Sequence, residues 1–131
     1  MEQPESDLEQ HYNMGIALKD MGLLDEAVGE LQRVCNALER GAEFADAVQA
    51  YTWLAHCLVE RGAPQAAVRW YKRALSIPSL DPDAQVAIHY ELGLAYEKAG
   101  VRADALEHFM EAYGSNIDYR DVAERIEALR G

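Results

Sequence analysis

Apolar and small residues recur along the chain with the spacing of one helix face, and polar residues fill the positions between them. From residue 11 they stand at i, i+3, i+4 and i+7, and the same spacing returns from residue 51 and from residue 89. Because an α-helix has about 3.6 residues per turn, this spacing predicts amphipathic helices. The residues are His11, Met14, Gly15 and Leu18, then Tyr51, Leu54, Ala55 and Leu58, then His89, Leu92, Gly93 and Tyr96.

A second apolar face follows each of these stretches after a glycine. Gly22, Gly62 and Gly100 stand where the first helix is expected to end, since glycine readily adopts the left-handed conformation found there. They recur at intervals of 40 and 38 residues, which predicts stacked helix pairs. The second faces are Ala27, Val28, Leu31, Val34 and Cys35; Ala67, Val68, Tyr71, Ala74 and Leu75; and Ala105, Leu106, Phe109, Ala112 and Tyr113.

Capping residues mark several expected helix starts. Ser or Asp before an apolar face accepts hydrogen bonds from free backbone N–H groups, and proline fits the first helical position. The predicted starts are Ser6 with Glu9 as a capping box, Pro64, and Asp81 followed by Pro82.

The C-terminal stretch predicts a seventh helix, from about residue 118 to residue 130. Asp118 is its expected N-cap, and Val122, Ile126 and Leu129 form a stripe at i, i+4 and i+7. A stack of helix pairs needs its last apolar face covered. We therefore expect this helix to cap the third pair.

The three units resemble the tetratricopeptide repeat, whose pattern is W-x2-L-G-x2-Y…A-x3-F…P. The resemblance implies an all-α fold, a right-handed α-solenoid of three antiparallel helix pairs plus the capping helix, in one domain of residues 1–131. The units depart from the pattern in their longer spacing, and only Pro78 stands near the expected closing proline. Repeat one is expected at about 8–41, repeat two at 44–78, repeat three at 82–117 and the capping helix at 118–130.

The charge balance limits the class of partner. The chain has 23 acidic and 12 basic residues, a formal net charge of −11, so we expect neither nucleic acid nor an anionic membrane surface. No apolar run is long enough to span a membrane, and the first residues are acidic and polar. We expect a cytoplasmic protein whose partner is basic or neutral.

The residues that could carry chemistry do not form a catalytic or cofactor-binding motif. His11 and His89 occupy equivalent packing positions, and neither metal-ligand spacing nor a phosphate-binding glycine loop is present. Cys35 and Cys57 lie in apolar helical patterns, which favours buried thiols over the alternative of a disulfide. We predict a non-enzymatic protein without a metal or cofactor.

The resemblance implies a concave groove lined by one side of each first helix. The positions beside the packing face hold aromatic, aliphatic and a few charged side chains. Their repetition predicts a binding stripe, because a continuous exposed apolar stripe usually marks an interaction site. Alternatively, the long inter-repeat segments cover some of these residues. The predicted binding residues are Tyr12, Ile16 and Lys19; Thr52, Trp53, His56 and Val59; and Tyr90, Leu94 and Glu97.

The stripe predicts a protein-binding adaptor. An apolar segment, which a helix could supply, with basic flanks fits the groove and the acidic chain. A carboxylate clamp is disfavoured, because only Asn13 and Lys19 resemble the lysines and asparagines of such clamps. Two alternatives remain: self-assembly with a second copy of the chain, and docking of a small Ras-like GTPase. The second alternative reflects a resemblance to repeat blocks of larger bacterial proteins in polarity, motility and pilus systems.

Overall fold

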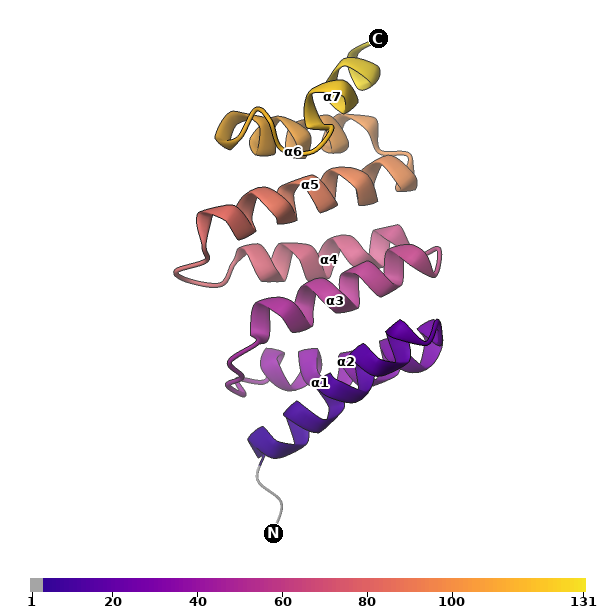
Figure 1. The fold of residues 1–131 in the computed structure, drawn as a ribbon, viewed down its shortest axis with the longest axis vertical. Helices are drawn as coiled ribbons and strands as arrows, with labels where there is room; N and C mark the ends of the chain where they lie inside the picture. The colour runs from indigo at the N-terminus through magenta and orange to yellow at the C-terminus, as the bar shows by residue number, and fades with distance from the viewer. Residues whose placement is uncertain (1–3) are drawn as a thin grey trace. The chain divides into compact units, whose positions relative to one another are not determined.

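The computed structural model describes residues 4–131, which form seven α-helices and no strand (Figure 1). The all-α prediction is confirmed. Each of the three predicted repeats contains two helices, and a seventh helix follows them. The helices are α1 (Pro4–Asp20), α2 (Leu24–Glu39), α3 (Ala47–Glu60), α4 (Pro64–Leu75), α5 (Pro82–Ala99), α6 (Arg102–Ser115) and α7 (Val122–Arg130).

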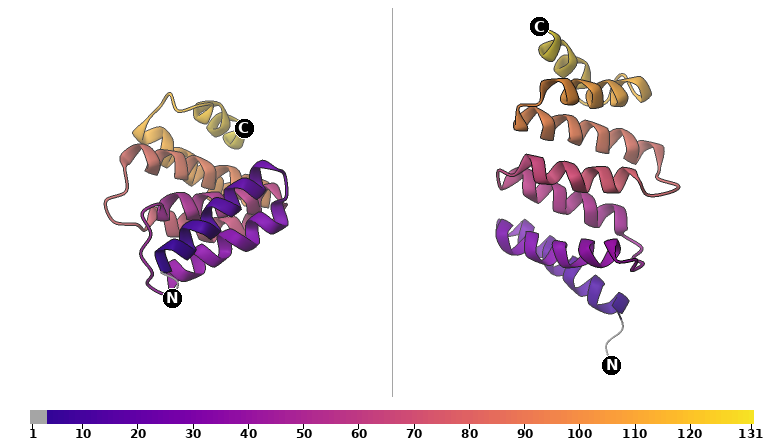
Figure 2. Two further views of the ribbon diagram at one scale, coloured as in Figure 1. Left: turned by 60° about the horizontal axis from the view of Figure 1, so that its bottom comes forward. Right: turned by 180° about the vertical axis from the view of Figure 1, so that it is seen from behind.

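The chain divides into two compact units, residues 1–70 and residues 71–131. The boundary falls inside α4, between Trp70 and Tyr71. The first unit contains α1, α2, α3 and the start of α4, and the second contains the end of α4, α5, α6 and α7 (Figure 2).

In the first unit, α1 turns back into α2 at Gly22. This glycine has a φ of +79°, and the N–H of Leu23 donates a hydrogen bond to the carbonyl of Leu18 at 2.9 Å. The two helices approach closely at Gly15, where an added Cβ would lie 2.7 Å from Cγ of Leu31. The predicted small-residue contact is therefore present in this pair.

The second unit repeats this arrangement in α5 and α6. Gly100 ends α5 with a φ of +80°, and the N–H of Val101 donates to the carbonyl of Tyr96 at 2.9 Å. An added Cβ at Gly93 would lie 2.5 Å from two ring atoms of Phe109. Glycine at this position lets the fully buried Phe109 ring fill the space between the helices.

The predicted capping role of α7 is consistent with its packing against α6 (Figure 1). Val122 and Ile126 are buried in one cluster with Phe109 of α6, and Leu129 packs against that cluster. The i, i+4, i+7 stripe thus faces the third helix pair, as its spacing predicts.

Two predicted helix starts are wrong and two are confirmed. α1 begins at Pro4, so Ser6 lies inside the helix and cannot be its N-cap. α7 begins after Asp121 rather than Asp118, because Asn116 first accepts a hydrogen bond from the N–H of Asp118 at 3.0 Å in a preceding turn. The confirmed starts are Pro64 for α4 and Asp81 for α5, where the Asp81 carboxylate accepts from the N–H of Asp83 at 2.9 Å.

Met14 is exposed although its spacing predicts burial. Its side chain is 52% exposed, whereas the equivalent Leu54 and Leu92 are fully buried. In the first unit α3 follows α2 and packs against it, but no described helix precedes α1.

Candidate functional site

The first unit carries a mixed aromatic and charged surface where α1 and α3 lie side by side. Trp53 of α3 is at its centre. The Lys19 ammonium of α1 lies 3.9 Å from the centroid of the Trp53 ring, a cation–π contact, and 2.9 Å from a carboxylate oxygen of Asp20. The His56 ring lies edge-on to Trp53 with centroids 5.9 Å apart.

Next to this surface is a depression of about 500 Å³, which we call the acidic pocket. Phe44 lines it and packs edge-to-face against Tyr12, with ring centroids 5.4 Å apart. Burial and the nearby Asp46 carboxylate raise the pKa of Tyr12, and a hydrogen bond from Trp53 opposes that rise. The pocket is lined by Glu9, Glu43, Phe44, Ala45 and Asp46, so it combines an aromatic ring with three carboxylates.

The other predicted residues of the first unit differ in their burial and in the partners they already have. Ile16 and Val59 are half-buried, and Thr52 donates its hydroxyl hydrogen to the carbonyl of Gln49 of its own helix at 3.2 Å. His56 is half-buried, with Nε2 2.8 Å from a carboxylate oxygen of Glu60. We define the α1–α3 face as Tyr12, Ile16, Lys19, Trp53 and His56.

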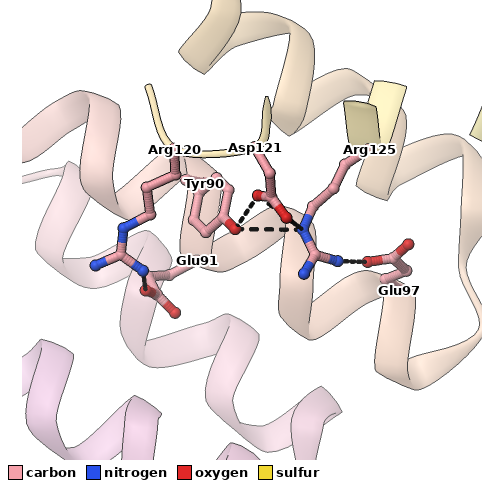
Figure 3. Close-up of polar contacts among 6 residues, drawn as sticks. All are labelled: Tyr90, Glu91, Glu97, Arg120, Asp121 and Arg125. Atoms are coloured by element: carbon pink, nitrogen blue, oxygen red, sulfur yellow. Dashed lines mark hydrogen bonds and ion pairs between the residues drawn. The ribbon is translucent and has the colours of Figure 1, made fainter. Parts of the chain in front are cut away.

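In the second unit the corresponding surface of α5 is covered by a polar network (Figure 3). The Tyr90 hydroxyl donates to Asp121 at 2.5 Å, and Nε of Arg125 lies 3.2 Å from the same hydroxyl and 3.1 Å from the Asp121 carboxylate. Nη1 of Arg125 donates to Glu97 at 2.9 Å. The hydrogen bond from Tyr90 lowers the pKa of Asp121, while burial raises the pKa of Tyr90.

The expectation that Tyr90 is exposed is therefore wrong. Its side chain is only 4% exposed and belongs to the core cluster, against which Leu94 also packs. Glu97 is held in its ion pair with Arg125. The seventh helix and the segment before it cover this side of α5, so Tyr90, Leu94 and Glu97 do not form an open binding surface.

The tyrosine that repeats one and three share has a packing role. In both units a second aromatic ring lies edge-to-face against this tyrosine, at 5.4 Å and 5.3 Å between centroids. Two residues after that second aromatic residue, an aspartate is the N-cap of the next helix. An aromatic-x-Asp segment thus positions the following helix in each unit. The contacts are Tyr12 with the Phe44–Asp46 segment before α3, and Tyr90 with the Tyr119–Asp121 segment before α7.

The acidic pocket was not predicted from the sequence. Its residues come from the start of α1 and from the segment between α2 and α3, which lies outside the repeat pattern. The recurrence of an aromatic-x-Asp segment at residues 44–46 and 119–121 was a usable indication. It would have placed both segments against the repeated tyrosine.

His89, His108 and the two cysteines lie wholly or partly buried between the helices. Nδ1 of His89 lies 3.0 Å from Nδ1 of His108, and burial lowers the pKa of both rings. Cys35 and Cys57 are buried and free, and burial raises the pKa of their thiols to about 12 and about 11. Thiols of that pKa are protonated at neutral pH and are poor nucleophiles.

Two further features are absent from residues 4–131. Within them, no group of three or more His, Cys, Asp or Glu side chains is arranged to hold a metal ion. None of the described helices is both long and apolar enough to cross a bilayer.

The family model of the tetratricopeptide repeat matches residues 48–79, which correspond to the predicted second repeat. Residues 48–79 are therefore similar to one tetratricopeptide repeat. A search of the curated proteins finds no matching sequence. Solved structures with the tetratricopeptide fold match nearly the whole chain at low sequence identity. The similarity in fold therefore includes the other two helix pairs.

Three of these structures illustrate the likeness. MamA is 21% identical with a TM-score of 0.76, covering 93% of this chain and 66% of its own. The second tetratricopeptide domain of human RPAP3, solved with the HSP70 peptide SGPTIEEVD, is 12% identical with a TM-score of 0.77, covering 98% and 99%. The Yersinia enterocolitica type III secretion chaperone SycD, solved with a peptide of the translocator YopD, is 17% identical with a TM-score of 0.73, covering 94% and 92%.

The chain is shorter than several of its structural neighbours. It spans 66% and 61% of two MamA chains and 46% of a yeast Sti1 fragment in complex with HSP90.

Proposed function

We propose that this chain is a protein-binding module whose site is the α1–α3 face together with the acidic pocket. The observation that carries the proposal is the half-exposed Trp53 beside an open pocket of about 500 Å³ that contains an aromatic ring and three carboxylates. Tryptophan and tyrosine at such places often dominate interface energies. All of these residues belong to the first unit.

The proposed partner is an apolar segment of another protein with a lysine or arginine at one end. Ile16 and the Trp53 ring offer apolar area to the segment, and the carboxylates of Glu9, Glu43 and Asp46 attract the cation. The formal net charge of −11 adds long-range attraction for a basic segment. The proposed role is that of an adaptor, which binds its partner without catalysing a reaction.

The geometry of Lys19 disfavours a carboxylate clamp. Its side chain is 17% exposed, and its ammonium is already shared between the Trp53 ring and Asp20. RPAP3 and SycD, which share the fold, are solved with bound peptides and support a peptide-binding use of it. The RPAP3 peptide contains three acidic residues, so the segment proposed here differs from it in charge.

The test is selection of 12-residue random peptides displayed on phage against the purified chain. We expect selected peptides to combine apolar residues with lysine or arginine. Affinity of a labelled selected peptide, measured by fluorescence anisotropy, should fall about 30-fold on Trp53→Ala, the loss of a typical hot spot of ~2 kcal/mol. Because Trp53 is half-buried, Glu43→Lys provides a second variant that removes charge attraction from an exposed position.

Glu124→Lys in α7 is the matched control, since it makes the same charge change at an exposed position in the second unit. Peptide binding should weaken several-fold with Glu43→Lys and stay unchanged with Glu124→Lys. Equal effects of the two variants would show that only net charge matters. Acidic selected peptides, or binding that tolerates both Trp53→Ala and Glu43→Lys in folded protein, would refute the proposed site.

A further inference from the structure

A second surface, on α6 and α7 of the second unit, is apolar and open. Met110 and Tyr113 of α6 are 44% and 40% exposed, one turn apart on the same side of the helix. They border a shallow depression of about 180 Å³ between the two helices. Its lining is Met110, Tyr113, Ala123, Ile126, Glu127 and Arg130, and we call it the α6–α7 face.

The start of α7 resembles the start of a first helix of a repeat. The Tyr119–Asp121 segment precedes it as the Phe44–Asp46 segment precedes α3. Ile126 and Leu129 also keep the i, i+3 spacing that Tyr51 and Leu54 show in α3. In the described residues, the first helices α1 and α5 each pack against an antiparallel second helix, α2 and α6. The α6–α7 face is therefore the place where an antiparallel helix would pack.

We propose that α7 of a second copy of this chain occupies the α6–α7 face, antiparallel and related by a two-fold axis. A two-fold axis perpendicular to a helix generates an antiparallel neighbour, and two-fold dimers are the commonest oligomers. Glu127 and Arg130 lie about one turn apart on the same face of α7. The axis therefore sets Glu127 of each copy against Arg130 of the other, with Met110 and Tyr113 packing beside them.

Two features make this dimer a weak one. α7 has nine residues, so the contact belongs to the small, transient class of interfaces below ~1,200 Å². Each copy also carries a formal net charge of −11, and the two copies repel. Added salt screens that long-range repulsion, so the dimer should form more readily at ~0.5 M salt than at ~0.05 M salt.

Reciprocal charge reversal tests the proposal by sedimentation velocity over protein concentrations from ~10 µM to ~1 mM. Glu127→Arg and Arg130→Glu each place like charges across the axis, and each should weaken the dimer at least tenfold. The double variant restores the pairs in reversed order and should recover the parent dissociation constant to within about threefold. Glu127→Arg also reduces the net negative charge of each copy. If only the overall repulsion between copies mattered, this variant would therefore associate more strongly than the parent.

Two further variants show whether the apolar part of the face is used. Tyr113→Ser should weaken the dimer about tenfold or more, and Tyr113 lies outside the buried core, so the fold should survive. Met21→Ser is the matched control, because Met21 is 69% exposed in the first unit. It should leave the dissociation constant unchanged, and thermal unfolding checks that every variant is folded.

The inference fails on any of three results. The chain could remain monomeric to ~1 mM in ~0.5 M salt, beyond the range of a weak specific dimer. The double variant could fail to recover the dimer, or Met21→Ser could abolish it while Tyr113→Ser has no effect. None of these results bears on peptide binding by the first unit, which is measured on a different surface.

Discussion

Replacing Gly93 by alanine should destabilise the chain, because the added methyl group has no room. The new Cβ would lie 2.5 Å from Cδ1 and Cε1 of Phe109, about 1 Å closer than an ordinary carbon contact. Phe109 is fully buried and lies against Tyr90 at 5.7 Å between ring centroids, so the ring cannot move aside freely. Overpacking of this kind costs ~1–3 kcal/mol, and the better helix propensity of alanine returns ~0.5–1 kcal/mol, leaving a net loss of ~0.5–2 kcal/mol.

The assay is urea unfolding followed by far-ultraviolet circular dichroism, which reports on all seven helices. Gly29→Ala is the matched control: it makes the same substitution within α2, where an added Cβ has no neighbour within 4 Å, and should stabilise by ~0.5–1 kcal/mol. Phe109→Leu combined with Gly93→Ala should recover part of the loss by relieving the overlap. If Gly93→Ala is as stable as Gly29→Ala, the close approach of α5 and α6 is refuted.

Three further predictions concern the second unit. Tyr90→Phe should keep the ring packing but lose the hydrogen bond to Asp121, lowering the unfolding free energy by ~1–1.5 kcal/mol in chemical denaturation; an unchanged midpoint would contradict the network. The folded-state pKa values of His89 and His108 lie below the unfolded value of ~6.5, so their stability contribution is complete above pH ~6.5 and declines as the pH falls below it. Urea titrations at pH 7.5 and 5.5 should show this decline, and His108→Gln should reduce it. Deletion of residues 118–131 should expose the core of the second unit, so the truncated chain should aggregate in light scattering; a soluble monomer of full stability would contradict the capping role.

The repeated helix pairs were predictable because their packing is encoded within each repeat. The glycines at residues 15 and 93 face a large residue sixteen positions later, and the glycines at residues 22 and 100 end the first helices with positive φ. These features depend on local sequence and on one neighbouring helix. The stripe of Val122, Ile126 and Leu129 was predictable for the same reason, since its spacing alone fixes one buried face.

The candidate site was predicted only in part, because the repeat pattern does not describe the segments between repeats. Tyr12 and Tyr90 occupy equivalent positions, yet the first remains half-buried and the second is buried beneath the segment before α7. The helix register identifies which side of α5 does not face its paired helix α6. It cannot tell whether a later segment covers that side. The acidic pocket was missed because Phe44 and its neighbours belong to such a segment.

The placement of the two tryptophans gives the proposed binding face an optical reporter. Trp70 is buried and stacked on Tyr51 at 5.9 Å between centroids, whereas Trp53 lies half-exposed under Lys19 and beside His56. Both tryptophans belong to the first unit, and the sequence has no others. A Trp70→Phe chain would therefore emit from one indole at the α1–α3 face. Its emission wavelength and quenching would follow ligand occupancy without any attached label.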